Sequence, residues 1–190
     1  MKSEPQSIRS ITSAQGDDGA TAFIGGKRVA KSGVRAHACG DVDEASAWIG
    51  LVRSRTAPSR LSRSLLRIQN HLYLINCELA INQSRKRAKT YLTRNHLSWL
   101  NQASRKTEAH LHLPHQFIIY GETESSAFLD VARAVVRRAE RNVAALHQAE
   151  PFSNQNILPY LNRLSDYLYL LAREQETRLG VSSRRAERNA

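Results

Sequence analysis

Charged side chains with a spacing suited to phosphate lie on one edge of a single predicted helix. This edge consists of Arg133, Arg137, Glu140 and Arg141, flanked by Arg138. Steps of three and four residues stack side chains along one side of a helix. Guanidinium groups held so close repel one another unless an anion lies between them, and their planar fork of donors suits phosphate. The spacing therefore predicts a phosphate-binding edge, with a solvated basic face as the alternative.

The helix that carries this edge is predicted over residues 128–146. Ala, Leu, Arg and Glu dominate the segment, and neither Gly nor Pro interrupts it. Apolar side chains recur at helical spacing on its other side, which predicts a buried stripe. The expected stripe consists of Leu129, Val131, Ala132, Val135, Val136, Ala139, Val143 and Leu146.

A second candidate for phosphate binding lies near the N-terminus. Residues 11–40 are too rich in glycine for a helix, and they contain a Gly16-Asp-Asp-Gly19 turn followed by Thr21. Such a turn offers free backbone N–H groups and a hydroxyl to a phosphate. Turns rich in Asp and Gly are also common at plain protein surfaces, so a surface loop is the alternative.

The remaining elements indicate an all-α chain. Periodicity predicts further helices over residues 43–57, 59–82, 93–110 and 153–177, and a short extended piece over 117–121. Asp41 and Asp43 are expected at the acidic N-terminal end of the first helix. Five helices with short connections predict an up-and-down bundle preceded by the glycine-rich loop. We expect a disordered lead-in over 1–10, one domain over 11–176 and a frayed charged tail over 177–190.

Composition limits the compartment and the class of partner. The chain has 190 residues and a formal net charge of +11, which favours a nucleotide, a nucleic acid or a membrane surface as partner. No apolar run is long enough to span a membrane, and the first residues lack an apolar signal core. Cys39 and Cys77 are too few for a disulfide framework, and we expect small buried thiols in a reducing, cytoplasmic compartment.

Two further segments have a plain interpretation and a functional one. The basic segment 84–90 is predicted to be a solvated connection, with a nucleic-acid patch as the alternative. His110, His112 and His115 lack helical spacing and nearby Cys or acidic ligands, so no metal site is expected there.

Six stretches, taken in order, resemble one enzyme family, the PduO-type ATP:cob(I)alamin adenosyltransferases, over about residues 11–176. The stretches are Gly16-Asp-Asp-Gly-x-Thr21, Gly25-Gly-Lys-Arg-Val-x-Lys31, Gly40-Asp-Val-Asp-Glu44, Ile68-Gln-x-x-Leu72 with Glu78-Leu-Ala80, Ala132-Arg-x-Val-x-Arg-Arg-Ala-Glu-Arg141 and Leu161-Asn-Arg-Leu-Ser-Asp-Tyr-Leu168. The last two are specific, whereas the glycine-rich ones are weak when taken singly.

The resemblance implies a trimer of helical bundles with active sites between subunits. Such an enzyme transfers the 5′-deoxyadenosyl group of ATP to the cobalt of a reduced corrinoid such as cobalamin and releases triphosphate. The implied cofactor is Mg²⁺ carried on the phosphates, with no protein metal site. A corrinoid reductase and a cobalamin-dependent enzyme are the implied partners, whereas neither a nucleic acid nor a membrane is expected.

The resemblance also implies roles for individual residues. The implied catalytic residues are Asp43, Arg133, Arg137 and Asn162, with Arg133 and Asp43 paired across the subunit boundary. Phe117 and Asp43 are implied to meet the corrinoid. The implied ATP-binding residues are Ser13, Gln15, Gly16, Asp17, Thr21, Ala22, Lys31, Arg137, Arg138, Glu140, Arg141 and Asn162.

The sequence departs from the family pattern beside both substrates. Where the family has Thr-Lys-Thr-Gly, this chain has Ser-Ala14-Gln15-Gly, so a lysine expected to meet phosphate is absent. Losing one such cation costs about 2–4 kcal/mol of charge stabilisation. Tyr120 and Glu122 replace residues of a Pro-Gly-Gly turn, and Asp130 replaces a histidine. These departures motivate the alternative of a non-catalytic paralogue that binds ATP or corrinoid as a sensor, carrier or delivery module.

Overall fold

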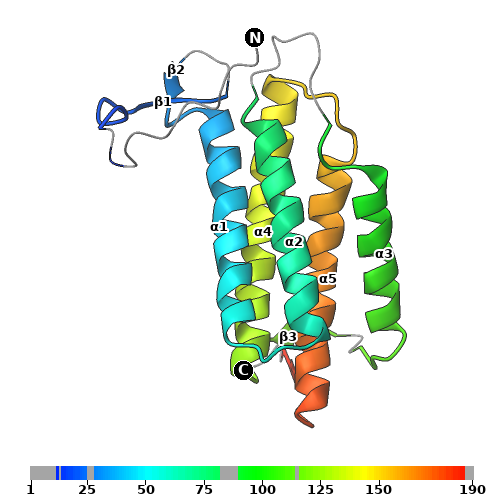
Figure 1. Cartoon of the computed structure of the whole chain (residues 1–190). Helices are drawn as coiled ribbons and strands as arrows, with labels where there is room; N and C mark the ends of the chain where they lie inside the picture. The colour runs from blue at the N-terminus through cyan, green and yellow to red at the C-terminus, as the bar shows by residue number, and fades with distance from the viewer. Residues whose placement is uncertain (1–11, 13, 25–27, 82–89, 114–115, 187–190) are drawn as a thin grey trace.

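Five helices form the bundle that the sequence predicts. The structure is a computed structural model that describes residues 12, 14–24, 28–81, 90–113 and 116–186. The helices are α1 (Val34–Ser54), α2 (Arg60–Leu79), α3 (Arg94–Glu108), α4 (Glu124–Ala149) and α5 (Ile157–Arg178). Their axes run side by side, up and down, and the connections lie at the two ends (Figure 1). The all-α fold class is confirmed.

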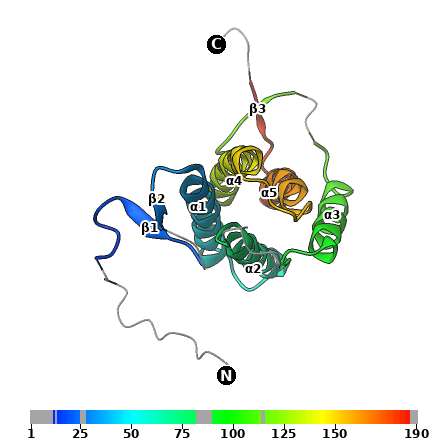
Figure 2. The same ribbon diagram turned by 90° about the horizontal axis from the view of Figure 1, so that it is seen from above.

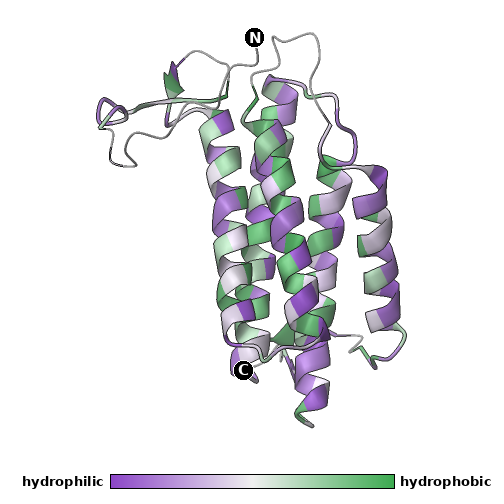
Figure 3. Cartoon of the chain, viewed as in Figure 1, coloured by the Kyte–Doolittle hydropathy of each residue, from purple (hydrophilic) through white to green (hydrophobic). Residues whose placement is uncertain are grey.

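Helix α4 lies at the centre of the packing. It has α1 on one side and α5 on the other, while α3 packs against the outer side of α5 (Figure 2) and meets α2 through the His71–His96 and His71–Trp99 ring contacts. Seven of the eight residues of its predicted apolar stripe are buried, from Leu129 to Leu146. The prediction is wrong for Val131, which is 38% exposed at the rim of the stripe. Hydrophobic and hydrophilic residues alternate along every helix, as expected for helices that bury one face (Figure 3).

Side-chain caps start α2 at the predicted position and α4 four residues before the predicted one. Ser59 accepts a hydrogen bond from the backbone N–H of Ser62 at the start of α2 (3.2 Å). Thr123 and Ser126 exchange two such bonds at the start of α4, a reciprocal arrangement that satisfies two otherwise unpaired N–H groups. Each cap of this kind contributes about 1 kcal/mol to stability.

Helix α1 differs most from the prediction. It begins at Val34, not near residue 43, so Asp41 and Asp43 lie inside the helix and cap nothing. The residue before it, Gly33, makes no side-chain cap, and no acidic residue lies in the first turn. Ala38 and Val42 are fully buried in the core, and this burial outweighs the low helix propensity of Gly40.

Two small antiparallel sheets lie outside the bundle. Strands β1 (Ala20–Ala22) and β2 (Arg28–Ala30) form a hairpin within the glycine-rich segment, beside the N-terminal end of α1. Strands β3 (Ile118–Ile119) and β4 (Arg184–Arg185) pair at the other end. The expectation of a frayed tail after residue 177 is therefore wrong for residues 184–185, which are tied to the start of the α4 segment.

Some predicted features lie outside the described residues. They are the lead-in over 1–10, the basic segment up to residue 89, Ser13 and His115. In the part of the chain that the structure describes, no helix is long and apolar enough to cross a membrane.

Candidate active site

Four of the predicted nucleotide-binding side chains surround one hollow of about 350 Å³. Arg137, Glu140 and Arg141 come from α4, and Asn162 comes from α5. The Asn162 amide donates a hydrogen bond to a Glu140 carboxylate oxygen (3.1 Å). This bond fixes the two side chains relative to each other. The helical spacing read from the sequence thus brings these four residues together.

Arg137 and Arg141 have no counter-ion among the residues that the structure describes. Neither forms a hydrogen bond or ion pair with any of the described residues, and both are exposed. Glu140 is the one carboxylate among the residues that line the hollow. Two guanidinium groups one helical turn apart therefore present an excess of positive charge, which a bound anion would neutralise.

Arg138 lies elsewhere, although it is the next residue to Arg137. Its Nε donates to Asp41 Oδ1 of α1 (3.2 Å), and its Nη2 is paired with Glu44. Consecutive helical residues point about 100° apart, so Arg138 faces α1 while Arg137 faces the side of α5. Arg138 therefore does not line the hollow. It joins α4 to α1 instead.

Arg133 lies further along the same edge, in a groove of about 550 Å³ that Arg137 also lines. Its partner in the chain is Asp130, with Nε 3.3 Å from Oδ1, and its guanidinium lies 4.7 Å from the centre of the Tyr120 ring. Asp43, the partner implied by the resemblance, is exposed on α1 and forms no ion pair with a described residue. Among the described residues of one chain, Arg133 thus pairs with Asp130 and not with Asp43.

The glycine-rich segment is folded on itself by two basic side chains. Lys31 Nζ donates to the carbonyl of Gly16 (2.7 Å). Arg28 forms an ion pair with Asp18 (2.6 Å) and donates to the carbonyl of Gln15. The hydrogen bond from Arg28 lowers the pKa of the Asp18 carboxyl below its ordinary value. Arg28 could not be singled out from its spacing, because its contact with Asp18 depends on the hairpin register.

Sharp turns shape the same segment. Gly19 has a φ of 79°, and Ala14 adopts a φ of 54°, which residues with a side chain rarely do. Asp17 N donates to Ala14 O (3.3 Å) and Gly19 N to Gly16 O (3.2 Å). Thr21 and Ala22 lie on β1, opposite β2. The predicted nucleotide loop is therefore a turn with internal hydrogen bonds that leads into β1 of the hairpin.

The hairpin and the arginine edge lie apart within one chain. Figure 2 shows β1 and β2 on the side of α1 that faces away from α4 and α5. The hollow at Arg137 opens between α4 and α5. One copy of the chain therefore does not bring the two halves of the predicted ATP site together.

Phe117 stands out at the opposite end of the bundle from the hairpin. It is 90% exposed, and its carbonyl accepts a hydrogen bond from Ala186 N (2.9 Å) next to the β3–β4 pair. Tyr120, close by, is 49% exposed. An aromatic side chain held out by a short strand is available to contact a large apolar ligand.

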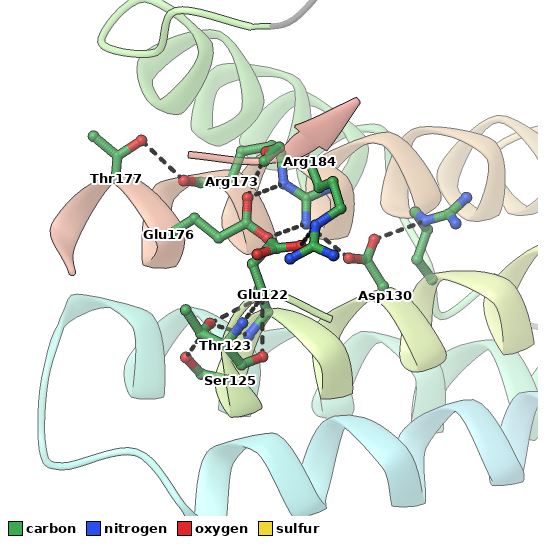
Figure 4. Close-up of polar contacts among 11 residues, drawn as sticks. Glu122, Thr123, Ser125, Asp130, Arg173, Glu176, Thr177 and Arg184 are labelled. Atoms are coloured by element: carbon green, nitrogen blue, oxygen red, sulfur yellow. Dashed lines mark hydrogen bonds and ion pairs between the residues drawn. The ribbon is translucent and has the colours of Figure 1, made fainter. Parts of the chain in front are cut away.

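A buried charged cluster that the sequence did not predict lies beneath this end. Arg173 contacts Asp130 and Glu176, and all three are at most 4% exposed (Figure 4). Burial disfavours the charged guanidinium, but the hydrogen bonds that it donates to Glu176 and Asp130 outweigh this effect and raise the pKa of Arg173. The i, i+3 spacing of Arg173 and Glu176 was the one signal in the sequence, and it is also common on solvated helix faces.

Known proteins resemble this chain over most of its length. A sequence model described as "Cobalamin adenosyltransferase" matches residues 11–175. The corrinoid adenosyltransferase of Bacillus subtilis is 35% identical over 179 residues, which are 92% of this chain and 91% of that protein. The corrinoid adenosyltransferase of Mycobacterium tuberculosis is 37% identical over 168 residues, 86% of each chain.

Solved structures agree with these sequence matches. One is a variant of the PduO-type ATP:corrinoid adenosyltransferase from Lactobacillus reuteri, complexed with cobalamin and ATP. It is 30% identical, superposes with a TM-score of 0.88, and covers 95% of this chain and 100% of its own.

Proposed function

Because this chain belongs to the cobalamin adenosyltransferase family, we propose that it transfers the 5′-deoxyadenosyl group of ATP to a reduced corrinoid. Cobalt(I) of the corrinoid attacks C5′ of ATP. The cobalt–carbon bond forms as the C5′–O bond breaks, and triphosphate leaves with the electron pair of that bond. The nucleophile belongs to the corrinoid, so the protein's task is to hold both substrates and to stabilise the leaving charge.

The main support for this proposal is that Arg137 and Arg141 form no ion pair with any described residue. Both line the hollow that Glu140 and Asn162 complete. Preorganised cations aimed at developing negative charge lower a reaction barrier without any reorganisation cost. We assign triphosphate binding to Arg137 and Arg141, and orientation of the nucleotide to Glu140 and Asn162.

The glycine-rich hairpin supplies the other half of the ATP site in this proposal. Gln15, Gly16 and Asp17 lie in the turn that precedes β1, Thr21 and Ala22 lie in β1, and Ser13 lies outside the described residues. Lys31 and Arg28 already contact the carbonyls of Gly16 and Gln15. These two cations are therefore close to the turn that would meet phosphate, which compensates in part for the alanine at position 14.

We propose that the active enzyme is a homotrimer with sites between subunits. The hairpin lies on the far side of α1 from the arginine edge, so a neighbouring copy has to bring one half of the site (Figure 2). The exposed Asp43 of one copy would then pair with Arg133 of the next. Assembly and site formation would be the same event.

The corrinoid is proposed to bind at the end marked by Phe117. Its exposed ring suits the flat apolar face of a corrin macrocycle. Mg²⁺ would take its ligands from the phosphate oxygens, the usual arrangement for this ion with nucleotides. Two half-buried free thiols, Cys39 and Cys77, fit a reducing cytoplasmic setting in which a reductase supplies cobalt(I).

Turnover with ATP and chemically reduced cobalamin tests the proposal. We expect the absorption spectrum of an alkylcobalamin to develop and triphosphate to accumulate in equal amount. Folded protein that binds ATP and corrinoid without converting them would support the non-catalytic alternative. That alternative is motivated by Ala14, which stands where the family pattern has a lysine. Folded protein that binds neither would contradict both functions.

A further inference from the structure

The Asp130 carboxylate is shared between two arginines. Its Oδ1 accepts a hydrogen bond from Arg133 Nε (3.3 Å), and its Oδ2 accepts one from Arg173 Nη2 (2.8 Å). The side chain is 4% exposed, so water does not compete for either oxygen. A buried carboxylate with one guanidinium on each oxygen has little rotational freedom.

Arg173 does not need Asp130 for its own neutralisation. Glu176 accepts from Arg173 Nε (2.8 Å) and Nη2 (2.7 Å), which is a two-point contact between buried groups. Glu176 is in turn held by the Ser183 hydroxyl (2.6 Å), in the segment that leads into β4. Figure 4 shows Arg173 between Glu176 and Asp130. The Arg173–Glu176 pair therefore acts as a fixed support for Asp130.

Arg133 is held from two sides. Asp130 contacts its Nε, and the Tyr120 ring lies 4.7 Å from the centre of its guanidinium. Its side chain is 17% exposed, and its terminal nitrogens form no hydrogen bond or ion pair with any described residue. These free donors belong to a residue that lines the same groove as Arg137.

We propose that Asp130 is a positioning residue that fixes the Arg133 guanidinium beside Arg137, with its terminal nitrogens free for a neighbouring subunit or substrate. The inference rests on the proposed function, which gives Arg133 its task. Asp130 touches no substrate in this scheme and acts only through Arg133. Tyr120 is the second support of the same guanidinium.

A double-mutant cycle between Asp130→Asn and Arg133→Gln tests the positioning role. Asn keeps the size of Asp130 but loses the charge that holds Arg133, while Glu176 still pairs with Arg173. We expect Asp130→Asn to lower kcat about tenfold, with the KM for ATP changed less than twofold. In the Arg133→Gln background the same change should cause no further loss, because interacting residues are non-additive.

Glu174→Gln is the matched control. It removes one carboxylate from an ion pair with Arg178 on α5 that involves neither Asp130 nor Arg133, and it should leave kcat unchanged. If Asp130→Asn lowers stability too far for kinetics, Tyr120→Leu removes the other support from a half-exposed position. Tyr120→Leu should likewise lower kcat in the wild-type background and not in the Arg133→Gln background.

Losses that simply add in the cycle, or an unchanged kcat in Asp130→Asn, would overturn the positioning role while leaving the proposed function intact. Absence of turnover in the wild type would instead count against the proposed function. A crystal structure of Asp130→Asn is a readout that needs no turnover. We expect the Arg133 guanidinium to leave its place over Tyr120, and an unmoved guanidinium would contradict the inference.

Discussion

Arg137 and Arg138 show which contacts can be predicted from residue types and spacing, and which cannot. Both are arginines of one motif, and the family resemblance assigns both to the nucleotide. The structure places Arg137 at a hollow without a partner among the described residues, and pairs Arg138 with Asp41 of α1 (3.2 Å). The spacing of α4 correctly groups Arg137, Glu140 and Arg141. It could not reveal the partner of Arg138, because that partner depends on where α1 begins and how it packs on α4.

Substitution of Arg137 tests the assignment at this scale. We expect Arg137→Ala to weaken ATP binding by roughly ten- to a hundredfold, since a charge-assisted hydrogen bond contributes about 1.5–3 kcal/mol. Calorimetric titration with ATP measures this, and light scattering shows whether the assembly is unchanged. Arg63→Ala, which removes an exposed arginine of α2, is the control and should bind ATP as the wild type does. Equal ATP affinity in both variants would contradict the assignment.

At the scale of elements, packing between helices determines where a helix begins when the sequence pattern does not. Gly40 and the lack of a side-chain cap argue against an early start of α1, yet Ala38 and Val42 are fully buried and the helix begins at Val34. Strand β4 was not predictable, because two residues carry no periodicity and their partner, β3, lies more than sixty residues away. The five helices themselves were predictable, since each has a long amphipathic pattern.

His71 of α2 connects two elements and makes stability depend on pH. Its Nδ1 lies 2.8 Å from the Tyr160 hydroxyl of α5, and burial lowers its pKa to about 4. The unfolded chain therefore takes up a proton near pH 6.5, before the folded chain does. The stability that neutral His71 contributes is full above pH 6.5 and is lost as the pH falls towards 4.

Urea unfolding at pH 7 and pH 5, at one protein concentration, measures this effect. The wild type should lose about 1–2 kcal/mol more on this change of pH than His71→Gln, in which nothing titrates at that position. The difference between the two proteins isolates His71 from the other titrating groups. An equal loss in both would show that His71 is protonated in the folded state.

The arrangement of the whole molecule explains why one chain does not form a complete ATP site in our proposal. The bundle holds the arginine edge between α4 and α5, and the hairpin projects from the far side of α1 (Figure 1). The motifs predict that both halves serve one nucleotide, but no spacing along the chain could show that they lie apart. Their separation is a consequence of helix packing, and it makes assembly part of the catalytic design that we propose.

The structure of the assembled protein with bound ATP tests this central claim most directly. We predict triphosphate against Arg137 and Arg141 of one subunit and against the turn at Gly16 to Thr21 of its neighbour, in a trimer. Nucleotide bound away from the arginine edge, or enclosed by the hairpin and arginine edge of the same chain, would contradict it.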